Sequence, residues 1–366
     1  MTIDSILKSD ERAIFTLRSI YKQYGYMPYK MSKFEEYDLY LKNKDFLLSD
    51  RIITFNDTNG KLLALKPDVT LSIIKNANEE SGSKQKVYYN ENVYRVSESS
   101  HQYKEIMQTG VECIGDIGTY DIYETVLLAA KSLEAIGGDF VLDISNLDIL
   151  TAALDGANSD SSFKAAAVKC IKEKNEHDLR RLCGEFGVSD KDTERLAVFA
   201  SLSGRLSEVI PELEKYLGSD ASDSLGELKA LCSLLYASGY ADKINFDFSV
   251  INDINYYSGV VFRGFIDGIS GCVLSGGRYD KLLKRMGRNL GAVGFAIYLD
   301  LIESIGERSA FDVDVLLLYD ENTDISSLSR AVNSYISSDK SVSAQKAIPE
   351  KLRYRELISL ISEVAK

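Results

Sequence analysis

The stretch 87–115 constrains the fold of this chain more than any other, because it has the pattern of two long strands joined by a polar loop. Apolar and polar residues alternate in VYYNENVYRV and again in IMQTGVECIG, whereas the intervening SESSHQYKE is typical of a turn. Successive side chains of a strand point to opposite faces, so Gln108 and Glu112 should share one face. Arg95, at the loop end of the first strand, would join them there.

Two interpretations of these three residues remain open on spacing alone. A cation, an amide and a carboxylate on one face of a sheet suit a pocket for a small zwitterion. Alternatively, Arg95, Gln108 and Glu112 are solvent-facing strand residues with no ligand.

Three separated motifs give the chain a resemblance to a known family. Arg95 after an aromatic residue, a loop and then EIMQTGVECIG is similar to motif 2 of class II histidyl-tRNA synthetases. It is closer still to their non-catalytic relatives, the regulatory subunits of ATP phosphoribosyltransferase. LKPDVT (65–70) and SGGRYDKLL (275–283) fit the same family in the same order, and the resemblance covers roughly residues 1–306. It implies an α+β fold with a class II aminoacyl-tRNA synthetase-like core, in which a mostly antiparallel sheet is flanked by helices.

Patterning along the chain then predicts four segments. Residues 1–145 would form the first part of the core, with motifs 1 and 2, and residues 146–242 a helical insertion. Residues 243–306 would complete the core with the histidine-pocket and motif 3 regions. Residues 311–366 predict a small C-terminal α/β unit that ends in a helix over 349–364.

Two helices and a hairpin are predicted with residue bounds. Apolar residues at helical spacing predict helices over 9–24 and 120–136, and Gly137 ends the second. RIITFND and KLLALK predict a strand hairpin that turns at Thr58-Asn59-Gly60 and leads into KPDVT.

Composition excludes several classes of protein. Of 366 residues, 45% are hydrophobic and 27% charged, which describes a globular protein with room for two or three domains. With 55 acidic against 43 basic residues the net charge is −12, so tRNA binding is not expected. Five scattered cysteines and two histidines argue against a metal site, and no cofactor is implied. No stretch is long and apolar enough to span a bilayer, so we expect a cytoplasmic protein without membrane association.

The resemblance implies a histidine pocket. In it Asp68, Thr70 and Gln108 would hold the ammonium group, and Arg95 the carboxylate through a charge-assisted fork. Glu112 and Tyr257 would bind the imidazole nitrogens. The full implied set of histidine-binding residues is Asp68, Thr70, Arg95, Gln108, Glu112, Tyr256, Tyr257 and Tyr279.

Two points about this set have alternatives. Asp68 stands where synthetases typically have Glu, and both Asp68 and Thr70 could instead cap the helix that follows. Tyr256 and Tyr257 are adjacent in a predicted strand, so only one should reach the ligand. We expect Tyr257 to do so and Tyr256 to lie in the core.

Departures from the synthetase pattern decide the predicted function. The segment that supplies a catalytic arginine in synthetases reads NDINYY here, with Asn252 in its place. Motif 3 ends in Glu-Arg in synthetases and reads Asp300-Leu301 here. One well-placed charge contributes roughly 3 kcal/mol to a transition state, so losing two cations predicts the loss of ATP activation and of aminoacylation.

A pocket that binds histidine without activating it suits a sensor, so the chain is predicted to be a regulatory subunit with no catalytic residues. In the family it resembles, such a subunit assembles as a hetero-octamer with a short-form ATP phosphoribosyltransferase catalytic subunit. That enzyme starts L-histidine biosynthesis from ATP and phosphoribosyl pyrophosphate and is inhibited by histidine. The resemblance also implies a homodimer built by motif 1 of the synthetase-like core.

Two other functions remain possible. A divergent histidyl-tRNA synthetase would need replacement cations, for which Arg263, Arg285 or Arg288 can be nominated. A synthetase-like amino-acid-binding module could instead serve a different partner with a different ligand.

Overall fold

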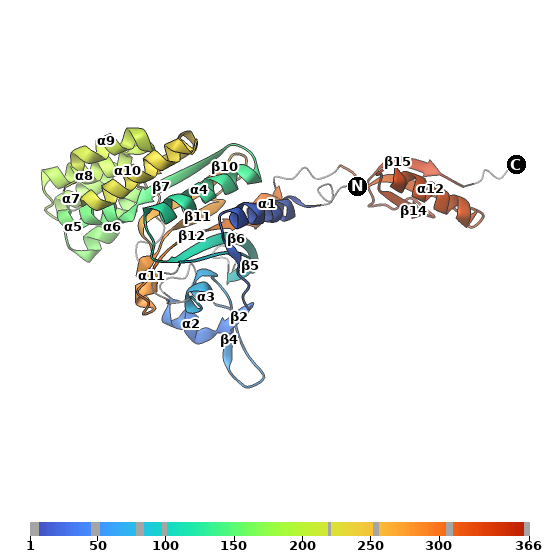
Figure 1. Cartoon of the computed structure of the whole chain (residues 1–366), viewed down its shortest axis with the longest axis horizontal. Coiled ribbons are helices and arrows are strands. Elements are labelled where there is room, and N and C mark those ends of the chain that lie inside the picture. Colours follow the sequence, from blue (N-terminus) through green and yellow to red (C-terminus); the bar gives the residue numbers. More distant parts are fainter. Residues whose placement is uncertain are drawn as a thin grey trace. The chain divides into compact units, whose positions relative to one another are not determined.

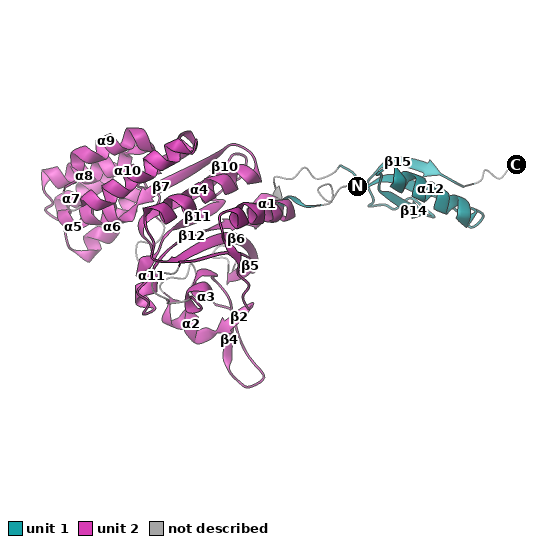
Figure 2. Ribbon diagram, viewed as in Figure 1, with its two compact units in different colours: residues 1–9, 305–366 teal, residues 10–304 magenta. Residues whose placement is uncertain are grey.

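The computed structural model describes residues 7–44, 52–77, 84–96, 101–218, 221–251, 256–304 and 310–361. The chain divides into two compact units, Asp10–Ser304 and a second one of Met1–Ser9 with Ile305–Lys366 (Figure 2). None of the helices in the described ranges has the length and apolar character that crossing a membrane requires.

The larger unit is built on a nine-stranded sheet with the order β1-β5-β6-β12-β11-β10-β7-β9-β8 (Figure 1). The pairs β1–β5 and β7–β9 are parallel and the other six are antiparallel, which confirms the mostly antiparallel sheet. Its strands are β1 (Met27–Pro28), β5 (Lys84–Val96), β6 (Tyr103–Gly115), β7 (Phe140–Asn146), β8 (Ser203–Arg205), β9 (Ile244–Asp247), β10 (Ser258–Ile266), β11 (Leu274–Arg278) and β12 (Gly291–Tyr298).

The predicted strand pair is the β5–β6 hairpin, which is paired from Lys84↔Gly115 to Val96↔Tyr103. Both of its faces are covered. Tyr88 belongs to the apolar core on one side of the sheet, and Tyr89 to a separate cluster on the other. Arg95, Gln108 and Glu112 lie on the Tyr89 face, because Tyr89 is paired with Gly110 and side chains alternate along each strand.

Two long helices contribute to the larger core, α1 (Ser9–Gln23) and α4 (Thr119–Ile136), as the spacing of their apolar residues predicts. Both lie along the same side of the sheet (Figure 1). Tyr21 of α1 is fully buried, and its hydroxyl lies 3.1 Å from Ser132 Oγ of α4. A buried hydroxyl costs free energy unless it is paired, so this hydrogen bond helps to set how the two helices pack.

The helical insertion contains six helices within the described residues, four of them with side-chain N-caps. Asn146, Asp160, Asn175 and Ser189 each accept hydrogen bonds from backbone N–H groups of the first turn that follows. The helices are α5 (Leu147–Ala157), α6 (Ser161–Lys172), α7 (Glu176–Glu185), α8 (Asp190–Ser201), α9 (Leu206–Tyr216) and α10 (Ser222–Ala237). The insertion also holds strand β8, which pairs with β9, so its helical pattern is interrupted by one piece of the main sheet.

Smaller elements complete this unit beside the β5–β6 hairpin. Strands β2 (Phe34–Glu36), β4 (Leu62–Leu65) and β3 (Thr54–Asn56) form a separate antiparallel sheet. The predicted hairpin turn is confirmed: Asp57 accepts from the N–H of Asn59, and Gly60 has φ +79°, which favours glycine. The short helices are α2 (Tyr37–Lys42), α3 (Thr70–Lys75), α11 (Asp280–Arg285), η4 (Ala241–Lys243) and η5 (Leu299–Ser304).

Within its described residues, the second unit is a parallel sheet of order β14-β13-β15 with one helix, which is an α/β arrangement. The helix predicted over 349–364 is wrong within the described residues, because β15 (Tyr354–Ser359) is a strand paired with β13. Leu316 and Leu317 of β13 are both fully buried, and a central strand needs a neighbour on each edge, which outweighs the local helical pattern. The other elements are β13 (Val313–Leu318), α12 (Ile325–Ser337) and β14 (Val342–Gln345).

Candidate functional site

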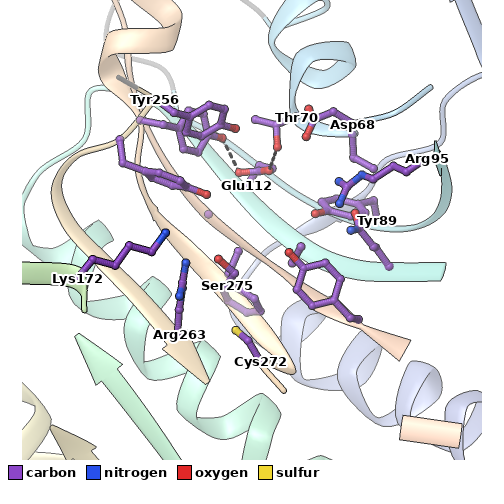
Figure 3. A pocket seen from close by; sticks show the side chains of 18 residues that line it. Asp68, Thr70, Tyr89, Arg95, Glu112, Lys172, Tyr256, Arg263, Cys272 and Ser275 are labelled. Carbon is purple, nitrogen blue, oxygen red and sulfur yellow. Dashed lines mark hydrogen bonds between the residues drawn. The ribbon is translucent and has the colours of Figure 1, made fainter. Parts of the chain in front are cut away.

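All eight residues implied by the resemblance line one cavity of about 470 Å³ in the larger unit (Figure 3). This volume lies within the roughly 300–1,000 Å³ of small-molecule sites. The residues come from four parts of the chain: the start of α3, the β5–β6 hairpin, the segment before β10 and the residue after β11. They are Asp68, Thr70, Arg95, Gln108, Glu112, Tyr256, Tyr257 and Tyr279. The interpretation of Arg95, Gln108 and Glu112 as solvent-facing residues is therefore wrong.

Glu112 is held at the inner wall by two hydroxyl groups. The Thr70 hydroxyl donates to its Oε1 at 2.8 Å, and the Tyr279 hydroxyl donates to its Oε2. Burial raises the pKa of Glu112 to about 8, against the opposing effect of these two hydrogen bonds, so its carboxyl group is protonated at neutral pH. The carboxyl group lies over Gly294, where a Cβ would come within 1.8 Å of Oε2.

Asp68 both caps a helix and lines the cavity, so its two predicted roles are compatible. Its Oδ1 accepts from the N–H of Leu71 at 2.9 Å, at the start of α3. Burial raises the pKa of Asp68, and the charge of Arg95 opposes that rise. Arg95 is oriented by a hydrogen bond of 2.9 Å from Nε to the carbonyl oxygen of Pro67, which holds its side chain beside Asp68 (Figure 3).

Tyr256 is 8% exposed and belongs to the apolar cluster on the Tyr89 side of the sheet, as expected of a core residue. Tyr256 and Tyr257 both line the cavity, with ring centroids 4.4 Å apart, and Tyr256 lies 5.8 Å from Tyr279. Strand β10 begins only at Ser258, so the alternation of strand side chains does not apply to the pair. A Cβ at Gly277 would lie 2.8 Å from the ring of Tyr257, which explains the glycine there.

Gln108 is 3% exposed and is paired with Tyr298 of β12 in the sheet register. Both side chains line the cavity. No hydrogen bond joins the Gln108 amide to another described residue, so this buried polar group faces the cavity ready to accept or donate.

Several lining residues were missed by sequence reasoning, which placed no function on them: Tyr89, Lys172, Cys272, Ser275 and Tyr298. Arg263, nominated only as a replacement cation, also lines the cavity. Arg263 and Ser275 are directly opposite in the β10–β11 pair. Their alternation with apolar neighbours places them on one face, but strand order decides which face meets the site. No local signal marks Lys172, which is the last residue of α6.

The chain departs from the synthetase catalytic pattern at two places, and the structure describes one of them. Asp300 and Leu301 lie in η5, after the last residue of β12. The predicted substitution at Asn252 lies outside the described residues. Among the described residues, no group of three or more His, Cys, Asp or Glu side chains could hold a metal ion.

The sequence matches the histidyl-tRNA synthetase family over residues 6–302. An ATP phosphoribosyltransferase regulatory subunit from Syntrophotalea carbinolica is 30% identical over 332 residues, which span 87% of this chain and 77% of the relative. The crystal structure of an ATP phosphoribosyltransferase regulatory subunit/histidyl-tRNA synthetase from Bacillus halodurans has a TM-score of 0.80 at 22% identity, covering 97% of this chain and 94% of that one.

A chain of the ATP phosphoribosyl transferase complex from Thermotoga maritima has a TM-score of 0.63 at 19% identity, covering 79% of this chain and 97% of that one. At these identities the two structures show the fold alone, which confirms the synthetase-like core. Together with the family match and the curated relative, they lead to one conclusion: this chain belongs to the ATP phosphoribosyltransferase regulatory subunits, a non-catalytic branch of the histidyl-tRNA synthetase family.

Proposed function

We propose that this chain senses L-histidine in the cavity around Glu112 and reports it to a short-form ATP phosphoribosyltransferase catalytic subunit. The role is regulatory rather than catalytic and belongs to L-histidine biosynthesis, in keeping with the names of its relatives. One observation carries the ligand assignment: eight residues from distant parts of the chain converge on a single cavity of amino-acid size or larger.

The chemistry of the cavity suits a zwitterion with a second polar group. Asp68, with Thr70 and the unpaired amide of Gln108, offers acceptors for an ammonium group. Arg95 keeps its terminal guanidinium nitrogens for the carboxylate, because its bond to Pro67 uses only Nε. Glu112 and Tyr257 would bind the imidazole, and a carboxyl group that is protonated at neutral pH can either donate or accept there.

Feedback control follows if histidine binds one state of the complex more tightly than the other. A ligand shifts an equilibrium only by its difference in affinity for the two states, so histidine must prefer the less active arrangement. The similarity of this chain to a chain of the Thermotoga maritima complex supports a partnership with the catalytic subunit.

We further propose that the chain forms a homodimer through the motif 1 region and a hetero-octamer with the catalytic subunit. Met27, Phe34 and Leu41 in that region are exposed apolar side chains, which a second copy would cover. Analytical ultracentrifugation of the chain alone and of the mixture tests both states. A monomer at micromolar concentration would contradict the dimer.

The regulatory proposal is tested by reconstitution with a short-form catalytic subunit. Product formation should require this chain, and L-histidine should inhibit the complex. Glu112→Ala should still support activity but lose most of the inhibition, because the mutation removes an imidazole partner and leaves the assembly surface intact. Equal inhibition of wild type and variant would rule out this cavity as the sensor.

One observation keeps the synthetase alternative worth a direct assay: Arg263 lines the cavity and is a cation of the kind that ATP activation needs. Arg285 and Arg288 do not line it, and Arg288 donates to the carbonyl oxygens of Lys75 and Ala77. Histidine-dependent ATP–pyrophosphate exchange by the purified chain would favour the synthetase, and we expect none.

A further inference from the structure

We propose that the cavity has a second binding position, for a phosphate group, at the side formed by Lys172 and Arg263. This position is distinct from the eight residues assigned to the amino acid, and it takes a phosphate-bearing small molecule or inorganic phosphate. The inference extends the proposed function and rests on the cavity being a small-molecule site.

The two cations reach the cavity from different parts of the larger unit. Arg263 is in the middle of strand β10, and its sheet partner on β11 is Ser275, so guanidinium and hydroxyl share one face. Lys172 ends helix α6 of the helical insertion and is exposed to solvent. In Figure 3 the Lys172 amine and the Arg263 guanidinium point toward one another, with Ser275 beside them.

The acids that line the cavity lie elsewhere in it. Among the described residues that line the cavity, the acids are Asp68 and Glu112, and they lie on the side of Thr70 and Arg95 (Figure 3). Lys172 forms no ion pair with another described residue. Two cations directed at one point repel each other, and an oxyanion between them removes that repulsion and binds both.

Two acids, Asp143 and Asp247, lie on the strands β7 and β9 that follow β10 in the sheet. Asp143 is opposite Arg263 on strand β7, but it does not line the cavity, and burial raises its pKa above the usual range. Asp247, which lies near Asp143, is in an ion pair with Lys174. The acid opposite Arg263 in the sheet thus lies outside the cavity lining, and Asp247 is paired with Lys174 rather than with Lys172.

Chemistry and size both favour phosphate over a second amino-acid group. Guanidinium, ammonium and hydroxyl donors that converge on one point are typical of phosphate binding, and a dianion matches two positive charges. A cavity of about 470 Å³ is of the size that holds drug-sized molecules, and an amino acid at Glu112 and Arg95 is much smaller. Space therefore remains on the Lys172 side when the amino-acid position is filled.

The test is calorimetric titration of the full chain with sodium phosphate and, separately, with L-histidine at constant ionic strength. Lys172→Gln and Arg263→Gln should each weaken phosphate binding about tenfold or more, the size expected for one lost charge-assisted hydrogen bond. Both should leave histidine affinity within about threefold, since neither cation belongs to the amino-acid position. Lys169→Gln is the matched control, because Lys169 is on the same helix but does not line the cavity.

Failure of this inference can be told from failure of the proposed function. Glu112→Ala should lose histidine binding and keep phosphate binding, and phosphate binding without any histidine binding would contradict only the proposed function. Absence of phosphate binding, or equal affinity in Lys172→Gln and wild type, would overturn the phosphate position. So would loss of histidine binding in Arg263→Gln, because Arg263 would then hold the carboxylate of the amino acid.

Discussion

The hydroxyl of Thr70 lies 2.8 Å from Oε1 of Glu112, although 42 residues separate the two in the chain. The first residue of helix α3 and the middle of strand β6 thus hold one buried carboxyl group between them, with Tyr279 on its other oxygen. The cavity around this group is the proposed ligand site, and all eight residues implied by the resemblance line it.

The buried carboxyl group makes stability depend on pH. Glu112 has its pKa raised from 4.5 to about 8, so the native state keeps a proton that the unfolded chain loses between these values. Stability should therefore fall as pH rises through this window. Glu112→Gln removes this dependence, so wild type should lose more stability than the variant between about pH 5.5 and pH 8 in urea unfolding. Parallel pH profiles would contradict the buried, protonated Glu112.

Tyr279→Phe should weaken histidine binding. The mutation keeps the aromatic ring but removes the hydroxyl that donates to Glu112, and this hydrogen bond lowers the pKa of that carboxyl group. The expected loss is about tenfold in affinity, typical of leaving one buried polar group without its hydrogen bond. Calorimetry measures it, with Tyr236→Phe as the control because Tyr236 is exposed. An unchanged affinity would show that Tyr279 does not support the site.

Gly294→Ala should displace the Glu112 carboxyl group and so disrupt the site. The new Cβ would lie 1.8 Å from Glu112 Oε2 and 2.4 Å from the carbonyl oxygen of Val111, and the second atom is backbone. We expect a loss of about 2 kcal/mol or more in unfolding free energy, together with loss of histidine binding. Gly184→Ala in α7 meets no atom within 4 Å and should be neutral or stabilising. Similar stability of the two variants would contradict this packing.

Breaking a buried ion pair of the larger unit should also lower the free energy of unfolding. Lys66 is completely buried and pairs with Glu91, whose side chain is 14% exposed. Lys66→Met leaves that carboxylate without its partner, and we expect a loss of about 3 kcal/mol. The matched control is Lys61→Met, because the Lys61–Glu36 pair is about half exposed and such pairs contribute less than about 1 kcal/mol. Equal effects of the two mutations in urea unfolding would contradict the account.

The hairpin and its pocket residues could be predicted because alternation is a local property. Once residues 103–115 are a strand, Gln108 and Glu112 must share a face, and the register Arg95↔Lys104 puts Arg95 on the same face. The helices α1 and α4 were predicted for a similar reason, since their apolar spacing is helical.

Other features could not be predicted, because they depend on distant parts of the chain. Arg263 joins the site only because β10 lies beside β11 in the sheet, and Lys172 only because α6 ends at the cavity. Tyr256 lines the cavity as well as belonging to the core, because β10 begins only at Ser258 and the strand alternation does not apply before it. Strand β15 has a helical pattern, and pairing with the buried strand β13 decides its structure.

The central claim is that this cavity binds L-histidine, and calorimetric titration of the purified chain tests it most directly. We predict one site per chain for L-histidine, no binding in Glu112→Ala, and normal binding in Lys169→Gln. Absence of L-histidine binding, with and without the catalytic subunit, or wild-type binding in Glu112→Ala, would contradict the account.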